Sequence, residues 1–359
     1  MKIIQIMPKF ALAGAERMAE ALILELKRQG CDVIVVSLYD YHSAITDNLE
    51  ANGVKVYYLG KRRGLDLSMI TKLVRLFRSE KPDVVHTHLY ICEYAIPAAV
   101  IARIKVRIHT VHNVAEKERL PKKLQHFFYH HCHVVPVGLS PLVKESIEQL
   151  YRLPGDWVPM VYNGIDISKA VQKESYQTGE VFNFLHVGRF APQKNHANII
   201  KAFDQLHRKY PNTALTMIGS GELYEAVQEQ SNGLGLQGAV SLPGLMDNMM
   251  EQYPLYDAFI LPSVYEGMPI TLIEAMATGM PIAASAVGGV PDMLCHEVNG
   301  LLCCAEVDSI VEAMERLYLD ETLREKLGRL ALADSARFTS KYMAEAYMDI
   351  YTKACRLVK

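Results

Sequence analysis

The stretch YDAFILPSVYEGMPITLIEAMATGMPIAASA, residues 256–286, decides the fold. It begins with an apolar run of strand length, YDAFILP, continues with a helical pattern, ITLIEAMATG, and ends with a second apolar run, MPIAASA. A strand, a helix and a second strand in succession predict a unit of a parallel sheet. Open sheets of this kind bind ligands at the carboxyl ends of their strands. A ligand is therefore expected at the loop between the first strand and the helix.

Two glutamates, Glu266 and Glu274, lie in this loop and in the helix that follows it. A loop carboxylate can accept hydrogen bonds from sugar hydroxyls, and one further down the helix can reach a second hydroxyl-bearing group. The backbone amides of the loop and of the first helical turn could bind phosphate, except that of Pro269, which has no N–H. A nucleotide sugar offers both kinds of group. The spacing alone is more often that of an ordinary helix acid and a solvated loop acid.

The composition is that of a two-domain globular protein. The chain has 359 residues, which suits two domains of about 150 to 180 residues each. Half of the residues are apolar and 22% are charged, as in ordinary folded proteins. The formal net charge of −2 argues against a nucleic-acid partner, because surfaces that bind phosphate backbones usually carry a marked basic excess.

The cysteines and the apolar runs favour a cytoplasmic location. The seven cysteines are scattered, odd in number and form no CxxC pair, so we expect reduced thiols and no metal site built from them. The apolar run in MKIIQIMPKF is too short for a signal peptide and reads as the first strand. No stretch approaches the 18 or so apolar residues of a spanning helix. Any membrane contact would be peripheral.

The alternation of apolar runs and amphipathic helical patterns continues along the chain. It starts with KIIQIMP and restarts with FNFLHVGR after a polar, unpatterned stretch. The predicted fold class is therefore α/β, with two Rossmann-like, doubly wound parallel sheets. We predict a first domain over residues 1–165, a linker over 166–180 and a second domain over 181–339. A final helix, at about 340–359, is expected to complete the first domain.

Arg189 and Lys194 follow the strand FNFLHVG in the stretch GRFAPQKN. Both cationic heads should project from the carboxyl end of that strand. An arginine and a lysine there can stabilise the charge of a departing diphosphate, a role that a divalent metal fills in many enzymes. The alternative is a solvated loop with two cations. A nicotinamide enzyme is not expected, because no GxGxxG follows the first strand.

Several motifs together resemble the retaining glycosyltransferases of family 4 (GT4), which have the GT-B fold. They occur in the order AGAER, VYNGID, HVGRFAPQKN, EGMPITLIEAMATGMPIAAS, VGGVPD and VNGLL, and they cover nearly the whole chain. The resemblance implies two Rossmann-like domains that face each other across a cleft. It also implies that the first domain binds the acceptor and the second binds the nucleotide sugar. No cofactor and no metal are expected.

The resemblance implies roles for residues of the second domain. Glu274 would bind the ribose of the nucleotide, and Glu266 would bind a hydroxyl of the transferred sugar. Arg189 and Lys194 would bind the two phosphates. The remaining donor contacts would come from the backbone, near the base and in the loop after the strand: Leu245, Met246, Gly267, Met268, Pro269 and Ile270.

In the first domain the resemblance points to Gly14 and His112. Gly14 stands where a strand enters a helix and lets a phosphate or sugar approach the backbone; the family usually has two glycines here, and this chain has Ala13 and Gly14. His112 would lie beside the transferred sugar, although a buried structural histidine is the alternative. His86 and His88 end a neighbouring strand, and we expect at most one of them on the same wall as His112.

The segment KERLPKKLQHFFYHHCH, residues 117–133, is basic and aromatic with helical spacing. Such a helix suits an anionic membrane surface, and a plain solvated helix is as compatible with it. His126 and His130 could meet on one helix face, but too few further ligands are nearby to favour a metal site.

The sequence thus predicts a retaining, metal-independent glycosyltransferase with Glu266, His112, Arg189 and Lys194 at its catalytic centre. The donor would be a nucleoside diphosphate sugar, with a UDP-sugar expected, and the acceptor a glycan or a lipid-linked acceptor of bacterial polysaccharide synthesis. One alternative is a GT-B nucleotide-sugar epimerase. Another is a two-lobed sugar-binding protein without catalysis, against which the presence of both acids and both cations argues.

Overall fold

The computed structural model describes residues 1–11 and 13–357, and these form two compact units. The first unit consists of residues 1–166 together with the chain from residue 338 onward, and the second consists of residues 167–337. Each unit contains one sheet of six strands. Both sheets are parallel and doubly wound, so the predicted fold class is confirmed.

The strands of the first sheet are short apolar runs, such as DVIVVS, that are buried almost throughout. Burial on both faces is typical of a parallel sheet that helices cover on each side. The sheet order is β3-β2-β1-β4-β5-β6. The strands are β1 (Lys2–Met7), β2 (Asp32–Ser37), β3 (Lys55–Tyr58), β4 (Val84–His88), β5 (Val106–Val111) and β6 (Val134–Gly138).

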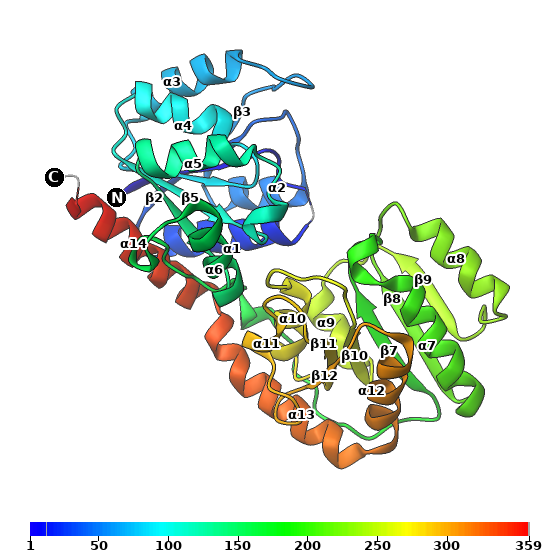
Figure 1. Ribbon diagram of the computed structural model, residues 1–359. Coiled ribbons are helices and arrows are strands. Elements are labelled where there is room, and N and C mark those ends of the chain that lie inside the picture. The colour runs from blue at the N-terminus through cyan, green and yellow to red at the C-terminus, as the bar shows by residue number, and fades with distance from the viewer. Residues whose placement is uncertain (12, 358–359) are drawn as a thin grey trace. The chain divides into compact units, whose positions relative to one another are not determined.

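The helices of the first unit are amphipathic. The helix α1 buries Met18, Leu22 and Leu26, which share one face at a spacing of four residues. In Figure 1, α3, α4 and α5 lie side by side over one face of the sheet. The helices are α1 (Gly14–Arg28), α2 (Ala44–Ala51), α3 (Ser68–Glu80), α4 (Cys92–Ile101), α5 (Lys122–His131), α6 (Pro141–Tyr151) and α14 (Ser340–Leu357), with short 3₁₀ turns at Ala115–Lys117 and Gly155–Trp157.

The helix α14 returns to the first unit after the chain has formed the whole second unit. It packs along α1, and Figure 1 shows this contact between the red and dark-blue ends of the chain. Its side chains Tyr347 and Tyr351 are completely buried against the sheet. The hydroxyl groups of these tyrosines bond to Gln5 of β1, His86 of β4 and Thr110 of β5.

The second sheet has the order β12-β11-β10-β7-β8-β9. Its core is rich in phenylalanine, with Phe182, Phe184 and Phe203 buried between the sheet and the helix α7. The strands are β7 (Phe182–Val187), β8 (Thr213–Ile218), β9 (Val240–Gly244), β10 (Ala258–Leu261), β11 (Ile282–Ser285) and β12 (Leu301–Cys303). The helices are α7 (His196–Lys209), α8 (Tyr224–Gly233), α9 (Met249–Gln252), α10 (Ile270–Ala277), α11 (Val290–Met293), α12 (Val307–Leu319) and α13 (Glu321–Asp334), with 3₁₀ turns at Ile167–Lys169, Pro192–Lys194, Tyr253–Leu255 and Ser335–Phe338.

Most of the stretch 166–180, which the sequence suggests as a linker, packs on the second unit. Tyr176 is buried, and its hydroxyl donates to the carbonyl of Gly279 at 2.9 Å. The Lys173 amide donates to the carbonyl of Thr278 at 2.9 Å. These contacts are mainly to the backbone. They require no periodic apolar residues, so the sequence of this stretch gives no sign that it packs on the second unit.

Each sheet has one place where the strand order reverses. In the first sheet β1 and β4 are neighbours there, and in the second sheet β7 and β10 are neighbours. Connections on the two sides of such a point run over opposite faces of the sheet, so the loops diverge and leave a crevice. These two points are where ligand-binding residues are expected in a doubly wound fold.

Candidate donor site in the second unit

An ion pair joins two predicted site residues at the reversal point of the second sheet. The Lys194 ammonium donates to Oε1 of Glu266 at 2.7 Å. Lys194 comes from the turn after β7, and Glu266 comes from the loop after β10. The two side chains are 12% and 9% exposed, so the pair is largely shielded from water but still reachable. Such a pair is screened far less than a surface ion pair.

Neighbouring residues fix the geometry of this pair. The Ser263 hydroxyl donates to the same Oε1 of Glu266 at 2.6 Å, and the Ser285 hydroxyl of β11 donates to the carbonyl of Ser263. Asn195 adopts a left-handed conformation (φ 62°), and its amide donates to the carbonyl of Pro262 at 3.0 Å. The loops after β7 and β10 are thus tied to each other on both sides of the ion pair.

This arrangement leaves hydrogen-bonding capacity for a ligand. A lysine ammonium has three donors and a carboxylate has two acceptor oxygens. The contact between Lys194 and Glu266 uses one of each. The remaining donors suit the oxygen atoms of a phosphate, and Oε2 of Glu266 suits a hydroxyl group.

Gly288 allows the backbone of the β11–α11 loop to pass directly over Glu266. It has φ +57°, and a Cβ at this position would lie 1.6 Å from the carbonyl oxygen of Glu266. The amide of Gly289 donates to the carbonyl of Gly267 at 2.9 Å. A side chain at Gly288 of the VGGVPD stretch would therefore overlap the backbone beside the site.

Replacing Gly288 by alanine should destabilise the second unit by at least about 3 kcal/mol, because the overlap with backbone and the unfavourable φ act together. The free energy of unfolding from urea titrations measures this. Gly238→Ala is the matched control in the same unit, since a Cβ there meets nothing within 4 Å. Equal stability of the two variants would contradict the close approach at Gly288.

Glu274 lies in the second turn of α10. The Tyr253 hydroxyl donates to its Oε2 at 3.0 Å and so orients the carboxylate, which is partly exposed. The helix α10 begins after Pro269 without a side-chain cap. No side chain therefore caps its first amides, and the binding of phosphate by the amides of this turn stays a prediction. Met268, Pro269 and Ile270 are buried and hold the loop in place.

The other predicted donor residues lie on the surface of the same unit. Arg189 follows β7 and is exposed, and within the described part of the chain no ion pair is found for it. Leu245 and Met246 follow β9, and Leu245 is 63% exposed. Within the described residues, no hydrogen bond or ion pair is found between these three side chains and the Lys194–Glu266 pair.

Gly219 and Gly221, in the loop after β8, have a packing role. Their φ angles are +150° and +155°, and a Cβ on them would lie 2.0 Å from the carbonyl oxygen of Gly188 and 2.4 Å from that of Phe190. The Phe190 amide also donates to the carbonyl of Ser220 at 2.9 Å. These glycines let the loop after β8 support the loop that carries Arg189.

The candidate residues of the first unit, Gly14 and His112, lie at the carboxyl ends of β1 and β5. Gly14 is exposed at the first turn of α1, which has no side-chain cap. His112 directly follows β5, and its Nε2 lies 3.2 Å from Nδ1 of His88. Burial lowers the pKa of His112 to about 3, so its ring is neutral at neutral pH.

The expectation that at most one of His86 and His88 shares a wall with His112 is wrong. Residues two apart in a strand face the same side, and the rings of His86 and His88 stack with centroids 4.2 Å apart. His88 contacts His112 directly and His86 packs behind it.

The basic aromatic segment 117–133 contains the helix α5. Phe127 is 51% exposed, and Lys123 is exposed on the same helix. The rings of His126 and His130 stack at 4.2 Å, and no group of three metal-ligating side chains occurs within residues 1–11 and 13–357. None of the helices in the described ranges is long and apolar enough to span a bilayer. Membrane contact through this segment stays a prediction.

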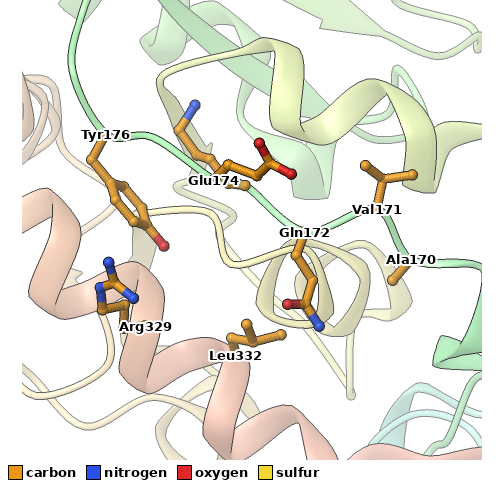
Figure 2. Close-up of a pocket in the computed structure, with 8 residues that line it drawn as sticks. Ala170, Val171, Gln172, Glu174, Tyr176, Arg329 and Leu332 are labelled. Carbon is orange, nitrogen blue, oxygen red and sulfur yellow. The ribbon is translucent and has the colours of Figure 1, made fainter.

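A cavity of about 570 Å³ opens elsewhere on the second unit, between the stretch 170–176 and α13. Figure 2 shows Gln172, Tyr176 and Arg329 around it. Arg329 pairs with Glu325 on its own helix at 2.7 Å. None of the predicted site residues lines this cavity, so it is separate from the candidate donor site.

Sequence reasoning missed the residues that hold the predicted ones. Ser263, Tyr253 and Asn195 orient Glu266, Glu274 and the Lys194 turn. A serine two positions after the end of a strand and a single tyrosine in another turn carry no pattern. Only Asn195, directly after Lys194 in the QKN stretch, offered a signal, because asparagine is one of the few residues that readily adopt the left-handed conformation.

Comparison with known proteins agrees with this architecture. Residues 12–169 match the family Glycosyltransferase Family 4, and residues 169–333 match Glycosyl transferases group 1. A solved structure of Anabaena HepE in complex with UDP-glucose superposes with a TM-score of 0.85 at 19% identity, over 98% of this chain and 100% of that one. A glycosyltransferase from Rickettsia africae superposes with a TM-score of 0.84 at 17% identity, over 98% of both chains.

Similar sequences include several glycosyltransferases. An uncharacterized glycosyltransferase of Methanocaldococcus jannaschii is 29% identical over 64% of this chain, and the match spans 62% of that relative's length. The Escherichia coli UDP-Gal:alpha-D-GlcNAc-diphosphoundecaprenol alpha-1,3-galactosyltransferase is 27% identical over 72% of each chain. The Bacillus anthracis N-acetyl-alpha-D-glucosaminyl L-malate synthase is 25% identical over 81% of this chain and 80% of that one.

The two sheets and these matches define a glycosyltransferase of the GT-B fold. Within that class, the chain belongs to glycosyltransferase family 4.

Proposed function

We propose that this protein transfers a hexose-type sugar from a UDP-sugar to a glycan or lipid-linked glycan, with retention of the anomeric configuration and without a metal ion. The observation that carries the proposal is the shielded Lys194–Glu266 pair at the reversal point of the second sheet. In this pair a cation that suits a diphosphate lies beside a carboxylate that suits a sugar hydroxyl. A nucleotide sugar has both a diphosphate and sugar hydroxyls.

The choice of donor and acceptor rests on similar proteins. HepE was solved with UDP-glucose, and the E. coli relative is named for transfer from UDP-Gal to a diphosphoundecaprenol-linked sugar. These names favour a uridine nucleotide as donor and a lipid-linked acceptor in bacterial polysaccharide synthesis. A lipid-linked acceptor would also give the exposed Phe127 and Lys123 of α5 a membrane surface to contact, with the protein on the cytoplasmic side.

In this proposal Lys194 and Arg189 bind the diphosphate and stabilise it as it leaves. Lys194 is already oriented by Glu266, whereas Arg189 is exposed and free to move onto a phosphate. A fixed cation lowers the barrier because little reorganisation is needed as negative charge develops on the leaving oxygen. Glu274 binds the ribose, and the loop from Gly267 to Ile270 surrounds the sugar and phosphates.

The reaction we propose needs no nucleophile from the protein. The bond between the anomeric carbon and the phosphate oxygen breaks, and the acceptor oxygen attacks from the same face. The departing phosphate oxygen takes the proton of the acceptor hydroxyl, so atoms and charge balance. His112, in the first unit, is assigned to the transferred sugar on the family resemblance. A double displacement would instead need a carboxylate close to the anomeric carbon.

A thermal-shift panel tests the donor and the metal independence together. We expect UDP and UDP-sugars, but not GDP or ADP, to raise the melting temperature equally with and without magnesium, because ligands that bind only the folded state stabilise it. Glu274→Ala should weaken UDP binding about ten- to hundredfold, the loss expected for hydrogen bonds to a charged group. Glu229→Ala, at an exposed position of the same unit, is the control.

Each outcome of this panel has a consequence. A shift with guanine or adenine nucleotides alone would overturn the uridine donor, and a shift only with magnesium would overturn metal independence. No shift with any nucleotide would count against the transferase itself. Unchanged UDP binding by Glu274→Ala would remove that residue from the ribose site.

A further inference from the structure

A chain of buried polar side chains crosses the reversal point of the first sheet and ends at His112. The Nδ1 atom of His88 lies 3.2 Å from Nε2 of His112, and Nε2 of His88 lies 2.8 Å from Oε1 of Gln5. Gln5 is on β1, His88 on β4 and His112 after β5, so neighbouring strands supply the contacts. Gln5 and His88 are completely buried.

The chain continues to the C-terminal helix. The Gln5 amide donates to the Tyr351 hydroxyl at 3.2 Å, and that hydroxyl lies 2.7 Å from Nδ1 of His86. Nε2 of His86 lies 2.7 Å from the Thr110 hydroxyl, which is 2.7 Å from the hydroxyl of Tyr347. The helix α14 thus completes a polar network that would otherwise leave several buried groups without partners.

The order of donors and acceptors follows from the Gln5 side chain. A carboxamide oxygen only accepts, so Nε2 of His88 carries the hydrogen. Burial lowers the pKa of His88 well below its usual value, so the ring is neutral and its Nδ1 has no hydrogen. Nδ1 of His88 then accepts from Nε2–H of His112. Because His112 is also neutral, its own Nδ1 is an acceptor.

The Nδ1 atom of His112 is available to a ligand. Its ring is partly exposed, and within the described residues its only hydrogen-bonding ring contact is that of Nε2 with His88. The backbone amides of His112 and Asn113 lie near the carboxyl group of Glu118, where they act to lower its pKa against the larger effect of burial. The ring is therefore fixed in position and in tautomer before any substrate binds.

We propose that Gln5 and His88 are positioning residues that hold His112 as the tautomer with a bare Nδ1, so that His112 accepts a hydrogen bond from a hydroxyl group of the substrate. This deepens the proposed function and, in its kinetic part, rests on it. If the ring could change tautomer, its Nδ1 would carry a hydrogen part of the time. In that state it could not accept a hydrogen bond from a substrate hydroxyl.

The tautomer itself is tested without substrate. In protein labelled with ¹⁵N-histidine, two-bond ¹⁵N–¹H correlation spectra distinguish a protonated from a bare ring nitrogen, and the His112→Gln variant identifies the signals of His112. We expect a bare Nδ1 and a protonated Nε2. The opposite amide orientation of Gln5 would reverse every donor in the chain, and a protonated Nδ1 on His112 would overturn the proposal.

Two substitutions of His88 separate positioning from folding. In His88→Asn, the side-chain oxygen can take the place of Nδ1 and still accept from His112. In His88→Gln, the side-chain amide can take the place only of Nε2, so the contact with Gln5 is kept and the contact with His112 is lost. We expect UDP release from UDP-glucose or UDP-galactose to fall about tenfold in kcat/KM for His88→Gln, the loss of roughly one hydrogen bond, and less for His88→Asn. Tyr347→Phe, at the far end of the network, should leave both the tautomer and kcat/KM unchanged.

The outcomes distinguish this inference from the proposed function. Equal losses in His88→Asn and His88→Gln, with unchanged tautomer signals of His112, would mean that His88 only stabilises the fold. Turnover by the wild type together with a protonated Nδ1 would overturn the positioning role alone. A bare Nδ1 in a protein that binds no UDP-sugar would confirm the network and overturn the proposed function.

Discussion

Replacing Lys194 by alanine should lower the turnover of the UDP-sugar by about a hundred- to a thousandfold, the range found when a preorganised group that stabilises developing charge is removed. The lysine is expected to act mainly on the transition state, where the leaving diphosphate gains charge. UDP release under saturating donor measures the effect, and KM should change much less than kcat.

The control must account for the buried partner. Without Lys194, the Glu266 carboxylate loses its cation, and breaking a buried ion pair is destabilising. Melting temperature and UDP binding of the variant therefore show whether it is folded. Lys201→Ala, on the exposed side of α7, should leave turnover unchanged. Unchanged turnover in folded Lys194→Ala would exclude Lys194 from leaving-group stabilisation.

Acid should unfold this protein at a pH where most carboxylates are still ionised. Six histidines, five of them buried and one partly exposed, have lowered pKa values, chiefly because burial disfavours their charged form. They are His86, His88, His109, His112, His186 and His196. Below about pH 6.5 the unfolded chain binds protons at these positions while the folded protein does not, so stability falls as pH falls.

Each such histidine contributes up to about 1.4 kcal/mol of lost stability per pH unit below 6.5, until the pH reaches its folded-state pKa. That limit is about 4 for His109 and His196. Glu118 acts in the opposite sense, because burial raises its pKa to about 7 and stability falls as pH rises from about 4.5 toward 7. The six histidines outnumber it, so we expect a net loss of several kcal/mol between about pH 7 and 5.

Urea unfolding at a series of pH values measures this loss. Four of the six histidines belong to the first unit, so a transition of that unit should shift faster with acid than one of the second. His109→Gln should reduce the pH dependence, whereas the same change at exposed His131 should not. Constant stability between about pH 7 and 5 would contradict the neutral burial of these rings.

The fold class could be predicted because both sheets consist of short apolar runs separated by amphipathic helices, the pattern of a parallel sheet covered by helices. It also placed Lys194 and Glu266 at strand ends. Their direct contact could not be predicted from spacing, since the two residues are 72 positions apart and meet only because β7 and β10 are neighbours.

Other features could not be predicted because they leave no periodic signal. Ser263 and Tyr253 act through one hydroxyl each, and Tyr176 is fixed by the backbone contacts of a polar segment. The error on His86 and His88 was different in kind. The strand period of two places the side chains of both histidines on one face of the sheet. Because the strand VVHTH is buried on both faces, its polar residues do not indicate which face of the sheet lies toward the site.

The return of α14 to the first unit has a consequence for the order of synthesis. Tyr347 and Tyr351 are made after all of the second unit, so Gln5, His86 and Thr110 must wait for their partners until translation is almost complete. The first half of the chain emerges earliest but can finish folding only last, and until then its polar groups at the sheet surface remain open to water. A chain stalled or cut near residue 338 would release a complete second unit attached to an unfinished first one.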